Sequence, residues 1–167
     1  KGFWNYQEWN AFLYAKRNFK KAQKKSIIPL RILNCLEEKP TVSYIIPTMM
    51  RQDFTVQLLG DLSQQSYTLS QVIIVDGTPE NQRKEGIYSS NKYPFEVIVK
   101  WQETSGSCRA RNEAINLCTS DYIVFGDDDL RLPANYIENH IRFLQTYKVD
   151  ACNGLDIRAD NQKQDLN

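Results

Sequence analysis

From Thr41 onward, short and continuously apolar runs alternate with longer segments of helical periodicity. The apolar runs are rich in β-branched residues, which is typical of strands that are buried on both faces. A strand followed by a helix and then another such strand favours parallel pairing, with the helices covering the sheet. The sequence therefore predicts a mostly parallel, Rossmann-like α/β open sheet with helices on both faces.

The predicted elements follow one another closely along the chain. Strands are expected at 42–46 (stopped by Pro47), 71–75, 94–100, 121–125 and 149–153. Helices are expected at 53–65 (with Phe54, Leu58, Leu59 and Leu62 on one face), 107–118 and 133–147. In open α/β sheets, ligands bind beyond the carboxyl ends of the strands. Polar residues at those positions are therefore the candidates for a functional site.

The sequence divides best near residue 40. Residues 1–40 form an N-terminal segment, in which residues 4–25 have the pattern of a basic amphipathic helix, and residues 41–167 form the α/β part. The aromatic face of the helix fits two interpretations: packing against the rest of the protein, or peripheral contact with an anionic membrane surface. We favour packing, because aromatic stripes usually mark it.

The bulk composition excludes several classes of protein. Hydrophobic residues make up 41% and charged residues 25%, as in an ordinary globular domain, and a net charge of +1 gives no reason to expect a nucleic-acid partner. The four cysteines show no metal-binding spacing and are expected to be free thiols. No signal peptide or membrane-spanning run is visible, so we expect a cytoplasmic protein, with the cytoplasmic membrane face as a further option.

Three adjacent carboxylates, Asp127, Asp128 and Asp129, follow the predicted strand at 121–125. Adjacent carboxylates repel one another unless a positive group lies among them, and carboxylates at a rigid strand end suit a hard divalent cation. Strand alternation predicts that Asp127 and Asp129 face one site while Asp128 points elsewhere. Taken alone, the triplet fits a metal site and a solvated acidic turn equally well.

Two further features lie at strand ends or helix starts. Asp76 ends the second predicted strand, where it fits either a turn or a hydrogen bond to a ligand. A glycine-containing loop at 105–107 leads into a helix whose first turn carries Arg109 and Arg111. A helix N-terminus and arginines both favour phosphate, although an N-cap serine with solvent-facing arginines is the simpler alternative.

These features, in their order, resemble the family 2 glycosyltransferases. The segments that carry the resemblance are residues 42–48 with Arg51, 72–78, the Ala-Arg-Asn element at 110–112, and 121–129 with Pro133. It covers residues 41–155, and the four motifs in order are far more specific than any one of them. The resemblance implies an incomplete GT-A fold, a nucleotide-diphosphate-sugar donor, a divalent Mg²⁺ or Mn²⁺ ion, and transfer with inversion to a carbohydrate or lipid-linked acceptor.

The resemblance also assigns roles to individual residues. It implies that Pro47 and Thr48 lie along the nucleobase pocket and that Asp76 hydrogen-bonds the base, usually uracil, so a UDP-sugar is the favoured donor. Donor-binding residues are expected to be Pro47, Thr48, Arg51, Asp76, Arg111, Asp127 and Asp128, and metal-binding residues Asp129 and Asp127. The catalytic base is expected beyond residue 167, and we assign that role to no residue of this chain.

Three other classes of protein are weaker fits to the sequence. A sugar-1-phosphate nucleotidyltransferase needs a glycine-rich loop after the first strand, where this chain has Pro47 to Arg51. A receiver-like regulatory module needs acidic residues there, and none comes before Asp53. A degenerate, non-catalytic nucleotide-sugar-binding or regulatory module stays open, because Met49-Met50 and Asp76-Gly77 depart from the pattern of the family.

Overall fold

The computed structural model describes residues 39–103 and 106–154. Contacts along the chain divide it into two units, Lys1–Ile32 and Leu33–Asn167, and the described residues belong to the second. The predicted basic helix at 4–25 and its membrane contact therefore lie outside the described residues. The predicted boundary at residue 40 stays a prediction.

The predicted parallel sheet is confirmed. The four strands are β1 (Val42–Thr48), β2 (Gln71–Asp76), β3 (Glu96–Trp101) and β4 (Tyr122–Phe125). All neighbours are parallel, in the order β3-β2-β1-β4, which puts β1 and β2 in the interior. Thr48 pairs with Asp76 and Asp76 with Trp101, so three strands end at the same level.

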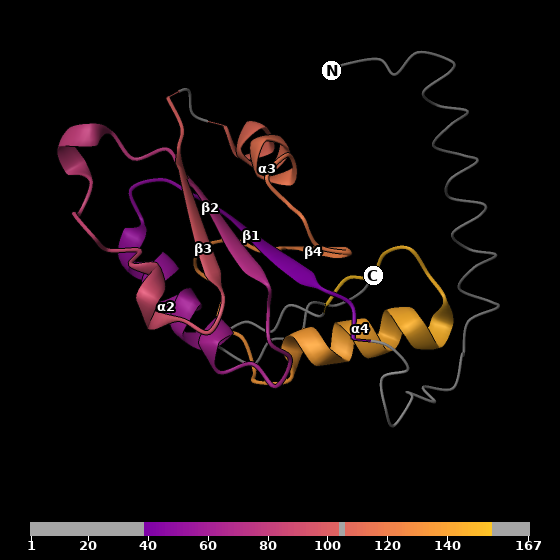
Figure 1. The fold of residues 1–167 in the computed structure, drawn as a ribbon. Helices are drawn as coiled ribbons and strands as arrows, with labels where there is room; N and C mark the ends of the chain where they lie inside the picture. The colour runs from indigo at the N-terminus through magenta and orange to yellow at the C-terminus, as the bar shows by residue number, and fades with distance from the viewer. Residues whose placement is uncertain (1–38, 104–105, 155–167) are drawn as a thin grey trace, which may run out of the picture. The chain divides into compact units, whose positions relative to one another are not determined.

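Helices cover both faces of this sheet, as expected. The helices are α2 (Gln52–Ser63), α3 (Ser107–Ile115) and α4 (Tyr136–Tyr147), and two 3-10 turns lie at Glu80–Gln82 and Ser90–Lys92. α3 lies on one face, whereas α2 and α4 lie on the other (Figure 1). Pro133 comes before α4 rather than in its first turn, and its carbonyl accepts a hydrogen bond from the Tyr136 amide.

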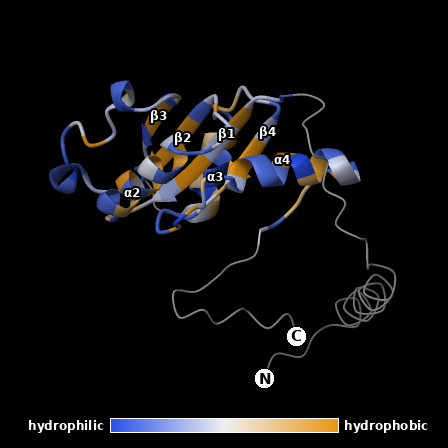
Figure 2. Cartoon of the chain, turned by 90° about the horizontal axis from the view of Figure 1, so that it is seen from below, coloured by the Kyte–Doolittle hydropathy of each residue, from blue (hydrophilic) through white to orange (hydrophobic). Residues whose placement is uncertain are grey.

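Strand alternation sorts the core into two clusters. Tyr44 and Ile46 of β1 are fully buried in the cluster that includes α2 and α4, whereas Ile45 packs with Ala110 and Ala114 of α3. Apolar residues are accordingly concentrated on the strands (Figure 2). Each large side chain buried in this way contributes about 1.5–3 kcal/mol, so the position of the strands is strongly determined.

Pro47 does not stop the first strand, contrary to the prediction. β1 continues to Thr48, and Pro47 stays in register with Val75 of β2. On its other side β1 is paired with β4 only as far as Ile45, opposite Phe125. A proline is tolerated there because its missing N–H faces the side where the neighbouring strand has already ended.

The predicted strand at 149–153 is wrong. α4 ends with Lys148 in the left-handed conformation (φ 49°), and residues 149–154 have no regular structure. They line a groove of about 1040 Å³ together with β4 and α4, without pairing with β4. Of the segment predicted as a strand, only Val149 is β-branched, and it is 38% exposed, so there is little burial to hold a further strand. Phe54 of α2 is likewise exposed, not on the core face as predicted.

The segment that follows the three aspartates is anchored to α2. Asp61 accepts two hydrogen bonds from the Arg131 guanidinium, from Nε at 2.7 Å and Nη2 at 2.9 Å, and one from the Leu132 amide at 3.0 Å. The side-chain hydrogen bonds from Arg131 lower the pKa of Asp61 below its ordinary value. This bidentate contact holds the start of the chain that leads to α4.

Replacing Asp61 by asparagine is expected to lower the free energy of unfolding by about 1 kcal/mol at pH 7. Because the pKa of Asp61 is depressed in the folded state, its contribution is present above the unfolded pKa of about 4 and is lost as the pH falls through the lower folded value. Urea unfolding at pH 7 and at pH 3 measures the difference. An Asp61→Asn loss that is equally large at both pH values would contradict this assignment.

Candidate functional site

One pocket of about 380 Å³ lies beyond the carboxyl ends of the strands. The end of β1, the loop after β2, the start of α3 and the turn after β4 all contribute to it. Its lining residues are Pro47, Thr48, Met49, Arg51, Gly77, Gln102, Gly106, Ser107, Ala110, Asp127, Asp128 and Asp129. The topology therefore brings together six of the predicted site residues, and Arg111 reaches one of them, Asp127.

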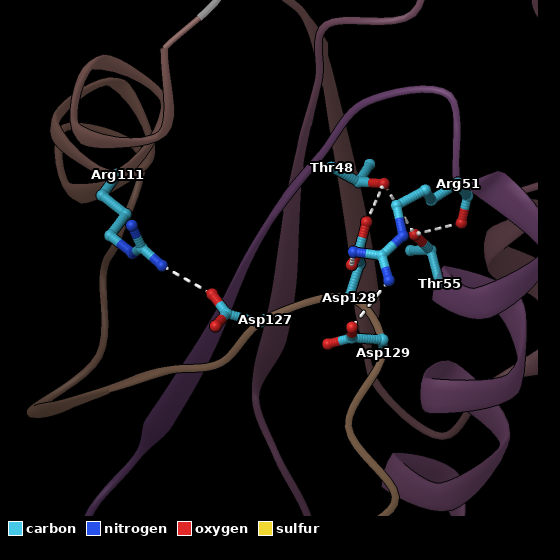
Figure 3. Close-up of polar contacts among 7 residues, drawn as sticks. All are labelled: Thr48, Arg51, Thr55, Arg111, Asp127, Asp128 and Asp129. Atoms are coloured by element: carbon cyan, nitrogen blue, oxygen red, sulfur yellow. Dashed lines mark hydrogen bonds and ion pairs between the residues drawn. The ribbon is translucent and has the colours of Figure 1, made fainter.

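The three aspartates form a turn after β4, and they do not alternate as predicted. Asp127 points towards α3, whereas Asp128 and Asp129 both point towards the start of α2 (Figure 3). The extended conformation ends at Phe125, and residues 128–129 are in a turn, so the alternation of a strand no longer applies. We call residues 127–129 the aspartate turn.

Arg111 of α3 forms an ion pair with Asp127, with 2.7 Å between Nη2 and Oδ1. α3 is held on the sheet by Ala110 and Ala114, whose small side chains allow a close approach. Arg111 follows Ala110 directly, and its side chain points towards Asp127, which lines the pocket (Figure 3). Both charged side chains remain partly accessible, at 31% for Arg111 and 66% for Asp127. A ligand can therefore replace either partner of this ion pair.

Arg51 pairs with the other two aspartates. Its Nη1 is 3.0 Å from Oδ1 of Asp128, and its Nη2 is 2.6 Å from Oδ2 of Asp129. The guanidinium also lies 5.2 Å from the centre of the exposed Phe54 ring, within the range of a cation–π contact. The hydrogen bond to Asp129 raises the pKa of Arg51. Arg51 precedes α2, and Met50 turns the chain there with a positive φ of 61°.

Asp128 is the buried member of the aspartate turn. Only 4% of the residue is exposed, and its Oδ2 accepts a hydrogen bond of 2.7 Å from the Thr48 hydroxyl. Thr55 of α2 donates in turn to Thr48, at 3.2 Å. Burial raises the pKa of the Asp128 carboxyl, against the opposing effects of Thr48 and Arg51. This chain of contacts holds the aspartate turn against the end of β1 and the start of α2.

Asp76 is fully buried and does not line the pocket. Its carboxylate accepts hydrogen bonds from Gln52 Nε2 at 2.9 Å, the Tyr88 hydroxyl at 3.0 Å and the Thr78 amide at 2.8 Å. Burial first, and then the neighbouring Asp76, raises the pKa of the Tyr88 hydroxyl. In this structure Asp76 therefore joins the end of β2 to α2 and to the loop that carries Tyr88.

Tyr44 lies directly beneath the start of the aspartate turn. A Cβ atom added to Gly126 would meet the Tyr44 hydroxyl oxygen at 1.9 Å and the ring carbon Cζ at 2.5 Å. Tyr44 is fully buried, and its hydroxyl has no hydrogen-bond partner in the described part of the chain. Burial, followed by Tyr136 and Asp127, raises the pKa of that hydroxyl. Glycine at 126 is therefore a steric requirement of this packing.

The carboxylate oxygens of the aspartate turn are the type of ligand that a small divalent cation prefers. Asp129 and Asp127 line the pocket and are 45% and 66% exposed. Among the described residues, no three His, Cys, Asp or Glu side chains converge as a complete set of metal ligands. Mg²⁺ typically takes one or two protein carboxylates and completes its shell with water and phosphate oxygens, so the residues fit an ion that arrives with a phosphorylated ligand.

Six lining residues are absent from the site residues predicted from the sequence: Met49, Gly77, Gln102, Gly106, Ser107 and Ala110. Gly106 adopts a φ of 148°, which favours glycine, and it precedes α3 directly. Its loop has the sequence of a phosphate-binding candidate. Gln102 gives no such signal beyond its place directly after a strand. Cys108, Cys118 and Cys152 are free thiols, as expected, and Cys108 is exposed.

A pocket at the carboxyl edge of a parallel sheet is where open α/β domains usually bind their ligands. The family model of glycosyl transferase family 2 matches residues 43–165. The chain belongs to this family, and its fold class is the one that the resemblance implied.

Two curated proteins have sequences similar to part of this chain. The putative colanic acid biosynthesis glycosyl transferase WcaA of Escherichia coli K12 is 30% identical over 96 residues, which are 56% of this chain and 34% of the relative. The putative teichuronic acid biosynthesis glycosyltransferase TuaG of Bacillus subtilis is 26% identical over 107 residues, 64% of this chain and 42% of the relative. The chain thus spans well under half the length of these relatives.

Solved structures share the fold. The mannosyltransferase PcManGT from Pyrobaculum calidifontis, in complex with GDP-Man and Mn²⁺, matches with a TM-score of 0.56 at 22% identity over 80% of this chain and 39% of its own. S. aureus TarS 1–349 in complex with UDP matches with a TM-score of 0.57 at 18% identity over 70% of this chain and 38% of its own. Within the described residues, no helix has both the length and the apolar character needed to cross a membrane.

Proposed function

We propose that this chain provides the donor-binding part of an inverting, metal-dependent glycosyltransferase that uses a nucleotide-diphosphate sugar, with a UDP-sugar favoured. The observation that carries the proposal is the aspartate turn. It lines a pocket at the carboxyl edge of a family 2 sheet, with an arginine on either side. The acceptor is a carbohydrate or lipid-linked hydroxyl, in keeping with the polysaccharide pathways named for the relatives. A cytoplasmic location stays a prediction.

Each part of the pocket has a proposed role. Pro47 and Met49, with the glycine backbone of Gly77, form the side that receives the nucleoside. The start of α3 and Arg111 face the diphosphate, which both a helix N-terminus and a guanidinium favour. The hydrogen bond from the base to Asp76 stays a prediction, and in the structure three donors already occupy that carboxylate.

Asp129 and Asp127 are the residues that would hold the divalent ion. When bound, such an ion acts as a Lewis acid and stabilises the negative charge on the phosphate oxygen that leaves. Arg111 adds a charge-assisted hydrogen bond to the same group of oxygens. Asp128, which is pinned by Thr48, instead keeps its two neighbours in place. The proton of the acceptor goes to a general base, a role that we assign to no residue of this chain.

Calorimetric titration with UDP, with and without Mn²⁺, tests the proposal, and GDP serves as the comparison. We expect UDP to bind in the presence of Mn²⁺ and much more weakly without it. Equally tight GDP binding would remove the uracil preference and leave the donor class intact.

A degenerate module that binds a nucleotide sugar without transferring it is the second candidate, because Met49-Met50 and Asp76-Gly77 depart from the family pattern. Metal-dependent UDP binding with no hydrolysis or transfer in the longest available form of the protein would favour that alternative. No binding of any nucleotide by that form would overturn both.

A further inference from the structure

We infer that Gln102 is the residue that reads the base of the donor. This inference rests on the proposed function, since it names the specificity determinant of the same pocket. Gln102 follows β3, and its backbone amide donates a 2.9 Å hydrogen bond to the carbonyl of Asp76. That bond sets Gln102 beside the Asp76-Gly77 backbone, and both Gln102 and Gly77 line the pocket.

The side chain of Gln102 is buried and incompletely bonded. Only 7% of the residue is exposed, and its Nε2 has no hydrogen-bond partner within residues 39–103 and 106–154. Such groups are rare, because an amide that loses water without gaining an acceptor is costly. Because Gln102 is one of the residues that line the pocket, we take a bound ligand as the source of the acceptor that Nε2 lacks.

The surroundings of Gln102 indicate which part of the ligand reaches it. Met49 packs against Gly77, with its Cγ at 3.7 Å from the position of a Cβ added to Gly77, and Pro47, which pairs in register with Val75 of β2, also lines the pocket. These residues carry no charge, whereas the aspartate turn and Arg51, which also line the pocket, are charged. A diphosphate and its cation belong with the charges, so the flat, uncharged base belongs beside Gln102.

Asp76 is poorly placed to read the base itself. Its carboxylate is fully buried and accepts three hydrogen bonds from the protein, and it does not line the pocket. A glutamine amide offers one donor and one acceptor side by side. The edge of uracil presents a carbonyl oxygen next to the N3–H, so the two edges are complementary: Nε2 donates to the carbonyl, and Oε1 accepts from N3–H.

The test replaces Gln102 by methionine, which has a similar shape and no amide. Calorimetry with Mn²⁺ present compares UDP, UDP methylated at N3, and inorganic pyrophosphate, which lacks a base. We expect Gln102→Met to weaken UDP binding about tenfold and to leave pyrophosphate binding within about twofold. Methylation at N3 removes the hydrogen that would be donated to Oε1 of Gln102, so it is expected to weaken UDP binding to the unaltered protein. In Gln102→Met the amide is absent, and methylation is expected to change the affinity little.

Thermal stability separates this role from a structural one. Removing an unsatisfied buried amide relieves its desolvation cost, so Gln102→Met is expected to raise the Tm by about 2–4 °C. The matched control is Gln57→Met on the exposed face of α2, outside the pocket, which is expected to change neither UDP affinity nor pyrophosphate affinity.

The outcomes are distinguishable. UDP binding that is unchanged in Gln102→Met, or that falls in parallel with pyrophosphate binding, overturns this inference and leaves the proposed function standing. A marked fall in Tm also overturns it, since the amide would then be structural. Failure of the unaltered protein to bind UDP contradicts the proposed function and, with it, the role of Gln102.

Discussion

Replacing Asp129 by asparagine is expected to abolish Mn²⁺-dependent UDP binding while the domain stays folded. Asp129 is an exposed carboxylate of the aspartate turn, and it is the predicted direct metal ligand. Changes in groups that merely support a metal ligand cost about 10–100-fold in affinity, so loss of a ligand is expected to cost at least about 100-fold. Calorimetry with Mn²⁺ and UDP measures the effect, and circular dichroism checks the fold.

Asp53→Asn is the matched control for this experiment. Asp53 is also an exposed aspartate in an ion pair, with Lys84, but it lies outside the pocket that the aspartate turn lines. Its replacement removes the same charge and is expected to leave UDP binding unchanged. If Asp129→Asn retains the affinity of the unaltered protein, Asp129 is not a metal ligand, and the metal assignment fails.

Replacing Gly126 by alanine is expected to lower the free energy of unfolding by about 1–3 kcal/mol and to weaken nucleotide binding. The added methyl would overlap the Tyr44 hydroxyl and ring, at 1.9, 2.5 and 2.8 Å from three of their atoms. Tyr44 is fully buried and has no room to withdraw, so the backbone before Asp127 must shift. Chemical denaturation and UDP titration measure the two effects.

Gly60→Ala provides the matched comparison. Gly60 lies inside α2, and an added Cβ there meets nothing within 4 Å. The same substitution at that position is expected to stabilise the protein by about 0.5–1 kcal/mol, because alanine is the better helix former. Equal stability changes at positions 60 and 126 would show that Tyr44 does not restrict Gly126.

Much of the fold could be predicted from local patterns. The β-branched runs at β1 and β2 have no stable place except a buried parallel sheet, and the two strands lie within a residue or two of the predicted bounds. The prediction for Pro47 was wrong because the tolerance of a proline there depends on where β4 ends, which is a property of a distant segment. The strand predicted at 149–153 was likewise wrong, because the segment is not buried against the sheet, and the sequence pattern does not reveal how deeply a segment is buried.

The candidate site could be predicted as a collection of residues, but not as a geometry. Strand ends placed Thr48 and the three aspartates at one edge of the sheet, and they do meet there. The direction of each aspartate depends on a turn whose shape follows from the partners Arg51 and Arg111, and these come from different elements. Gln102 was missed because an unsatisfied amide is recognisable only when its surroundings are known.

Arg111 reaches the aspartate turn from α3, and Arg51 reaches it from the position just before α2; these two helices lie on opposite faces of the sheet (Figures 1 and 3). The two positive charges of these arginines offset only part of the charge of the three carboxylates, so the turn keeps a negative charge before any ligand arrives. An anion that attracts Arg51 or Arg111 leaves a carboxylate without its partner, and a cation that takes a carboxylate releases a guanidinium. Binding of either ion thus frees a protein group that can bind the other, and thermodynamic linkage requires each ion to raise the affinity for the other by the same factor. Nucleotide and metal would then behave as a single composite ligand, with an affinity greater together than either has alone.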